Sequence, residues 1–85
     1  MSDPTPAQLR VLRGLARDEA KSCLEYDPPT NTVWHHWPLS GLLVRPRSST
    51  FHALERRGWI APNGWQGSFC GVMYGLTDAG REVIR

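Results

Sequence analysis

The stretch Arg47-Ser48-Ser49-Thr50-Phe51-His52-Ala53-Leu54-Glu55-Arg56-Arg57-Gly58 decides the fold of this 85-residue chain. It predicts a helix over 48–57, because Ser48 can act as N-cap and Gly58 can take the left-handed position after the last turn. Phe51 and Leu54 fall on one side of this helix. The opposite side has no large apolar residue and carries Ser49, His52, Ala53 and Arg56. We therefore expect one buried side and a small, polar outer side.

A β-hairpin and a short helix are predicted after this segment. Residues 59–61 and 69–76 are rich in apolar and aromatic residues and are expected to be strands, whereas residues 62–67 contain proline, asparagine and glycine and predict a loop. Thr77 or Asp78 can cap a last helix, which has only about two turns before the chain ends.

The N-terminal half begins with a strong helix signal. Thr5 can cap a helix that starts at Pro6, and Gln8 completes a capping box. Apolar residues at three- and four-residue spacing continue this helix to about Ser22. The following segments are predicted as a loop over 25–32, a short strand over 32–37 and a short helix over 39–44.

The length and composition fit a single globular domain over residues 1–85, with a flexible N-terminus over 1–5. Hydrophobic residues make up 40% of the chain and charged residues 21%, which is ordinary globular usage. No apolar run is long enough to cross a membrane, so we expect a cytoplasmic protein with no membrane partner.

Positive charge is concentrated in the second half of the chain. Residues 1–44 hold four basic and five acidic residues, a net of −1, and residues 45–85 hold six arginines and three acidic residues, a net of +3. The total of +2 is too small to indicate a nucleic-acid partner by itself.

Metal and nucleophilic chemistry find little support, and we expect no cofactor and no enzyme. His35 and His36 are adjacent in a predicted strand and therefore point to opposite faces, so they cannot converge on one metal ion. Cys23 and Cys70 do not form a Cys-x-x-Cys pair. Ser48 and Ser49 stand where a helix needs its cap, and no Gly-x-Ser-x-Gly turn is present.

Two segments resemble the recognition helix, wing and exit helix of MarR- and PadR-like bacterial winged-helix proteins. They are 49–60, STFHALERRGWI, and 74–81, YGLTDAGR. The resemblance covers about half of the chain. It implies an α+β winged helix-turn-helix, with three helices, a small antiparallel β-hairpin wing and a short C-terminal helix. It also implies a bacterial or phage transcriptional regulator that binds double-stranded DNA in a sequence-specific manner.

A recognition helix needs short or polar groups that can approach base edges and basic groups that can reach phosphates. By this resemblance, the base-facing residues are Ser49, Thr50, His52 and Arg56. The phosphate contacts are expected from Arg45, Arg47 and Arg57. Because DNA-binding domains of this size often pair over two half-sites, a homodimer is also possible.

A protein partner is the alternative to DNA. The predicted wing has no lysine or arginine, although such wings usually carry a basic residue at the tip. It offers Trp65, Gln66 and Phe69 instead, which suit a protein contact. The segment from Trp34 to Trp37 is a second possible protein-binding surface, so a winged-helix adaptor or inhibitor remains the rival hypothesis.

Overall fold

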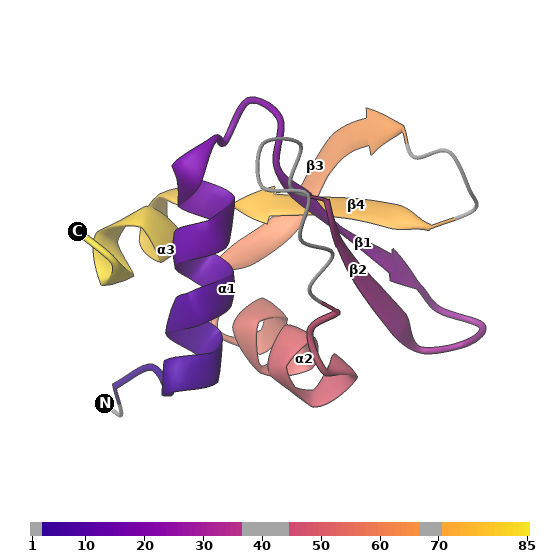
Figure 1. Cartoon of the computed structure of the whole chain (residues 1–85), viewed down its shortest axis with the longest axis horizontal. Coiled ribbons are helices and arrows are strands. Elements are labelled where there is room, and N and C mark those ends of the chain that lie inside the picture. The colour runs from indigo at the N-terminus through magenta and orange to yellow at the C-terminus, as the bar shows by residue number, and fades with distance from the viewer. Residues whose placement is uncertain (1–2, 37–44, 67–70) are drawn as a thin grey trace.

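A computed structural model describes residues 3–36, 45–66 and 71–85, with the backbone alone for His36, Trp65 and Gln66. Three helices and four strands lie in these ranges: α1 Pro6–Arg17, β1 Cys23–Asp27, β2 Thr32–His36, α2 Ser48–Arg56, β3 Ile60–Gln66, β4 Val72–Leu76 and α3 Asp78–Val83. The predicted α+β class is confirmed. The helices gather around one side of the sheet, and the two strand pairs extend away from them (Figure 1).

The start of α1 is as predicted and its end is not. Thr5 accepts a hydrogen bond from the Gln8 backbone, and the Gln8 side chain accepts one from the Thr5 backbone, which completes the capping box. The helix ends at Arg17 instead of near Ser22. The backbone N–H of Ser22 donates to the Asp18 carbonyl at 2.8 Å, and this turn reverses the chain into β1.

The sheet is antiparallel, with the strand order β2-β1-β4-β3. The prediction of a loop over 25–32 was wrong at its start, because β1 continues to Asp27 and the turn is confined to 28–31. Leu24 and Tyr26, two positions apart, both pack in the core against the helices, which is the two-residue period of a strand. The predicted strand over 32–37 is confirmed as far as His36.

The core lies between the sheet and the helices. Phe51 and Leu54 of α2 are fully buried, as predicted, and they pack with Leu12, Leu15 and Leu24. The ring of Phe51 is stacked on Tyr26 and lies edge-on to Tyr74. Burial of these side chains holds α2 against the sheet, with its other side turned outward.

The predicted loop over 62–67 was also wrong in part, because β3 continues to Gln66. Its pairing with β4 is irregular between Pro62 and Gln66, where Gly64 has a φ of 80°. β3 lies at the edge of the sheet, and an edge strand tolerates a proline that cannot donate to a neighbouring strand. The turn-forming residues are therefore accommodated within a strand.

α2 departs from prediction at both ends, because its cap differs and it ends at Arg56 instead of Arg57. Arg47 is the N-cap of α2, without a side-chain cap, and Ser48 is its first helical residue. Gly58 adopts the predicted left-handed conformation, with a φ of 72°. Thr77 caps α3, as predicted, by accepting a hydrogen bond from Gly80. The predicted short helix over 39–44 lies outside the described residues.

Candidate nucleic-acid interface

The outer side of α2 has the polarity that the sequence predicted. Ser49 and Arg56 lie opposite Phe51 and Leu54 on the helix, and both are exposed to solvent. Ala53, on the same side, is half-buried and adds only a methyl group. This side of α2 therefore presents a narrow strip of small and polar groups from which the arginine projects.

Two arginines flank the start of α2. Arg45 and Arg47 are both exposed, and Thr50 in the first turn is half-buried. The Arg45 guanidinium lies 4.3 Å from the centre of the Trp34 ring on β2. Such stacking restrains the arginine while leaving its N–H groups at the edge of the guanidinium plane able to donate.

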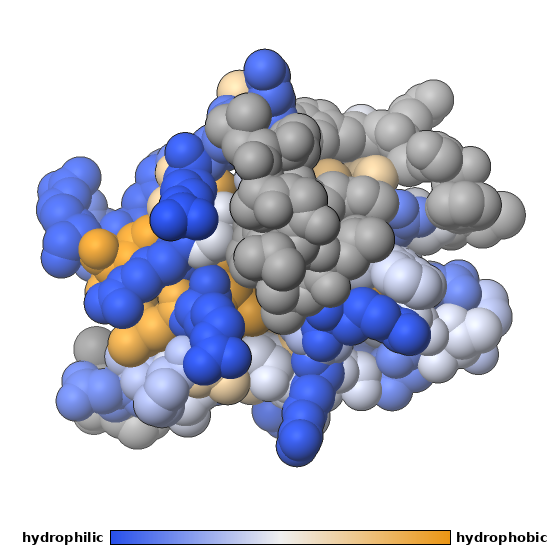
Figure 2. Space-filling model, viewed as in Figure 1, coloured by the Kyte–Doolittle hydropathy of each residue, from blue (hydrophilic) through white to orange (hydrophobic). Residues whose placement is uncertain are grey.

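Two more arginines follow at the end of α2. Arg56 and Arg57 are exposed, and the Arg57 guanidinium lies 4.6 Å from the centre of the Trp59 ring. Strongly hydrophilic side chains border the lower part of the molecule, where α2 lies, and apolar side chains show between α1 and α3 (Figure 2).

These four arginines give the α2 region its positive charge. Against Arg45, Arg47, Arg56 and Arg57, the segment 45–57 has one carboxylate, that of Glu55, which leaves a net of +3. In the C-terminal segment 58–85, Arg81 and Arg85 are matched in number by Asp78 and Glu82. The net positive charge of the second half therefore lies in the segment around α2.

His52 lies on one flank of the outer side of α2, and its side chain also contacts other parts of the molecule. Its Nε2 lies 2.9 Å from the Oδ1 of Asn31, and its Nδ1 lies 3.7 Å from the Glu55 carboxylate. The ring lies edge-on to Tyr26 and to Phe51. With 40% of its side chain exposed, His52 is held against the β1–β2 turn.

The side chain of Glu55 lies on the same flank of α2 as His52. Its Oε2 accepts a hydrogen bond of 2.7 Å from the hydroxyl of Tyr74, a residue of β4 that is only 8% exposed. Burial, together with the hydrogen bond to Glu55, raises the pKa of Tyr74 from 10 to about 12. The one carboxylate of α2 is thereby held beside β4, away from Ser49 and Arg56.

The residues of the predicted protein-binding surface are only partly within the described structure. Phe69 and Trp37 lie outside the described residues, as do the side chains of Trp65 and Gln66. Trp65 belongs to β3 and not to a loop.

Two large apolar side chains are exposed among the described residues: Trp34 at 37% and Val72 at 40%. Trp34 pairs across the sheet with Glu25, whereas Val72 pairs with Tyr26. Because neighbouring residues of a strand point to opposite faces, Trp34 and Val72 lie on different faces. They therefore do not form one apolar patch.

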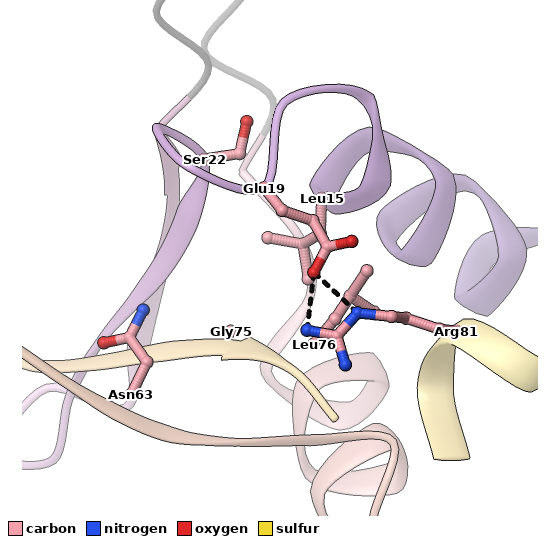
Figure 3. A pocket seen from close by; sticks show the side chains of 7 residues that line it. All are labelled: Leu15, Glu19, Ser22, Asn63, Gly75, Leu76 and Arg81. Carbon is pink, nitrogen blue, oxygen red and sulfur yellow. Dashed lines mark hydrogen bonds and ion pairs between the residues drawn. The ribbon is translucent and has the colours of Figure 1, made fainter. Parts of the chain in front are cut away.

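A pocket of about 170 Å³ lies on the other side of the molecule from β2, between the end of α1, the β3–β4 pair and α3 (Figure 3). It is lined by Leu15, Glu19, Ser22, Asn63, Gly75, Leu76 and Arg81. The carboxylate of Glu19 forms an ion pair with the guanidinium of Arg81. Its Oε1 lies 2.7 Å from Nη2 and accepts a hydrogen bond of 2.8 Å from Nε. This ion pair joins the two charged residues of the lining and links the turn after α1 to α3.

Other kinds of site receive no support from the described structure. Within residues 3–36, 45–66 and 71–85, no group of three His, Cys, Asp or Glu side chains is arranged to hold a metal ion. In the same ranges, no helix has the length and apolar character needed to span a bilayer.

Comparisons of this chain with known protein families, with curated proteins and with solved structures gave no match. Its function has to be inferred from its own residues.

The polar residues beside α2 were missed from the sequence. Tyr26 and Asn31 fell in the predicted loop over 25–32, and Tyr74 was placed only as a strand residue. Asn31 did carry a signal, because asparagine adopts the left-handed backbone conformation more readily than most residues, and its φ is 53°. No sequence pattern, however, indicates that this turn contacts His52.

Proposed function

We propose that this protein binds double-stranded DNA in a sequence-specific manner and regulates transcription, with α2 entering the major groove. The observation that carries the proposal is the outer side of α2. There Ser49 and Arg56 are exposed, while Phe51 and Leu54 anchor the opposite side in the core. A helix with one anchored side and one open polar side can approach base edges closely.

The charge around α2 supports the same proposal. Arg45 and Arg47 stand before the helix, and Arg57 stands after it, all three exposed. These positions allow arginines at both ends of α2 to reach phosphates while Arg56 faces the bases. Arginine is suited to both contacts, because its planar guanidinium forms paired hydrogen bonds with phosphate or with guanine.

The order of elements supports a winged helix-turn-helix of the MarR- and PadR-like kind as the finer fold. α2 is followed directly by the β3–β4 pair, in the position of a wing, and α3 follows β4. β1 pairs with β4, which extends the hairpin to three strands, and β2 adds a fourth at the edge.

Salt dependence of duplex binding tests this function. The affinity of the protein for a random-sequence duplex pool is measured by fluorescence anisotropy over a series of salt concentrations. Because phosphate neutralisation releases counterions, the logarithm of the affinity should fall linearly with the logarithm of the salt concentration. Three or four phosphate contacts from the arginines around α2 predict a slope of about −3.

The same experiment separates DNA binding from protein binding. If micromolar protein binds no duplex at low salt, the proposal is contradicted and the protein-binding alternative is favoured, in which the Trp65 segment or the segment from Trp34 to Trp37 forms the contact. Arg85→Ala is a matched control, because Arg85 is exposed, carries the same charge and lies beyond α3. It should leave the slope unchanged.

A further inference from the structure

The β1–β2 turn is joined to α2 through the side chain of Asn31. The Oδ1 of Asn31 accepts a hydrogen bond of 2.9 Å from the hydroxyl of Tyr26, and the same oxygen lies 2.9 Å from the Nε2 of His52. One amide group therefore bridges β1 and α2. In Figure 1 the β1–β2 hairpin runs past α2 on the way to its turn.

The backbone places this amide where the bridge requires it. Asn31 has a φ of 53°, a left-handed conformation that few residues other than glycine and asparagine adopt readily. Its N–H donates to the Pro28 carbonyl at 3.2 Å, and Thr30 donates to Asp27 at 2.6 Å. The turn is thus fixed by its own bonds, and the Asn31 side chain is left to contact α2.

A second link holds the same flank of α2 one turn further on. Glu55 accepts the hydrogen bond of Tyr74, and Glu55 lies three residues after His52. Residues three apart lie on the same side of a helix, so the two links attach one flank of α2 to β1 and β4. Apolar contacts at Phe51 resist separation of α2 from the sheet, whereas directional bonds on one flank resist rotation of α2 about its axis.

We propose that Asn31 is a positioning residue, which fixes the rotation of α2 through His52 and so sets the direction in which Ser49 and Arg56 face the duplex. This inference rests on the proposed function, because it concerns sequence discrimination by the same helix. His52 then acts mainly as the attachment point of the turn, with one ring nitrogen at Asn31 and the other near Glu55.

The variant Asn31→Gly tests the bridge with little disturbance of the turn. Glycine accepts the left-handed φ of this position, so the turn can form while the amide is lost. Tyr26→Phe removes the other bond to the amide and keeps the ring stacked on Phe51 at 4.6 Å. Thr30→Ala is the matched control, because Thr30 lies in the same turn and bonds to Asp27 instead of α2.

The measurements are the affinity for a random duplex pool and the affinity for duplexes that the wild-type protein selects from that pool. We expect Asn31→Gly to lower the preference for selected over random duplexes at least about fivefold, because a rotated helix loses base contacts. Affinity for the random pool and its salt slope should change little, since the arginines remain. Thr30→Ala should keep the full preference.

The packing of His52 against Tyr26, which the Asn31 bridge supports, is observed separately as nuclear Overhauser effects between the ring protons of the two residues. These should weaken in Asn31→Gly and persist in Thr30→Ala. An unchanged preference in Asn31→Gly, with wild-type protein that does discriminate, overturns the positioning role alone. Wild-type protein that retains no duplex overturns both this inference and the proposed function.

Discussion

The hydroxyl of Tyr74 on β4 donates a hydrogen bond of 2.7 Å to the carboxylate of Glu55 on α2. Tyr74 also lies edge-on to Phe51, with 4.8 Å between ring centres, so the same side chain makes a polar and an apolar contact with the helix. This hydrogen bond gives the buried hydroxyl a partner and holds the carboxylate of α2 away from Ser49 and Arg56 on the outer side of the helix. Its energetic contribution depends on the protonation of Tyr74.

We expect the Tyr74 hydroxyl to make the stability of the protein sensitive to alkaline pH. The folded structure raises the pKa of Tyr74 from about 10 to about 12, so above pH 10 the unfolded chain loses this proton more readily than the folded one. The stabilisation is complete below about pH 10 and is lost as the pH rises toward about 12. The wild-type free energy of unfolding should fall by about 1 kcal/mol more than that of Tyr74→Phe between about pH 9 and pH 11.

Urea denaturation of the two proteins at both pH values measures this difference. A parallel loss of stability in wild type and Tyr74→Phe would show that folding does not raise the pKa of Tyr74.

Gly80 should tolerate no larger residue. It is buried in the first turn of α3, and a Cβ atom at this position would clash with the carbonyl oxygen of Trp59. That carbonyl is held in place by a hydrogen bond of 3.1 Å from the N–H of Thr77, so it cannot easily move aside. We expect Gly80→Ala to lower the free energy of unfolding by about 2–4 kcal/mol, although alanine favours helices.

Gly58→Ala is a useful comparison for Gly80→Ala. A Cβ atom at Gly58 would meet nothing within 4 Å, and only the left-handed φ of 72° opposes the substitution. Its cost should therefore be about 1 kcal/mol, as expected from conformation alone. Thermal denaturation followed by circular dichroism ranks the two variants, and equal melting temperatures would contradict the predicted clash at Gly80.

Phe51 is expected to contribute more to stability than its apolar area alone. It is fully buried and its ring contacts those of Tyr26, His52 and Tyr74. Phe51→Leu keeps an apolar side chain but loses these ring contacts, so we expect a loss of about 1–3 kcal/mol. Chemical denaturation measures it, and a loss below about 0.5 kcal/mol would mean that the aromatic contacts add nothing to burial.

Local sequence signals predicted the elements that depend on neighbouring residues. The capping box of Thr5 and Gln8, the left-handed Gly58 and the cap at Thr77 all involve partners within a few positions along the chain. The buried side of α2 followed from the spacing of Phe51 and Leu54 in the same way.

The errors arose where contacts between distant segments outweighed local propensity. Proline and asparagine near 28–31 suggested a long loop, but pairing with both β2 and β4 makes Cys23–Asp27 a central strand. Pro62 and Gly64 suggested a loop, but pairing with β4 keeps them in an irregular edge strand. The link between Asn31 and His52, which are 21 positions apart, has no local signature at all.

The arginines around α2 should divide into two kinds by their effect on DNA binding. Arg56 is exposed beside Ser49 on the outer side of the helix, so Arg56→Ala should lower the preference for selected duplexes about fivefold or more. Arg45, which is stacked on Trp34 before the helix, is placed for a phosphate, so Arg45→Ala should weaken binding to all duplexes alike and reduce the salt slope by about one.

Anisotropy titrations with selected and random duplexes measure both effects, and Arg85→Ala, which removes the same charge from an ion pair with Glu82, serves as control. Melting temperatures are compared first, so that a change in folding is not mistaken for a lost contact. If Arg56→Ala and Arg45→Ala both bind like Arg85→Ala, α2 is not the DNA-contacting element, because the proposed function assigns a base contact to Arg56 and a phosphate contact to Arg45.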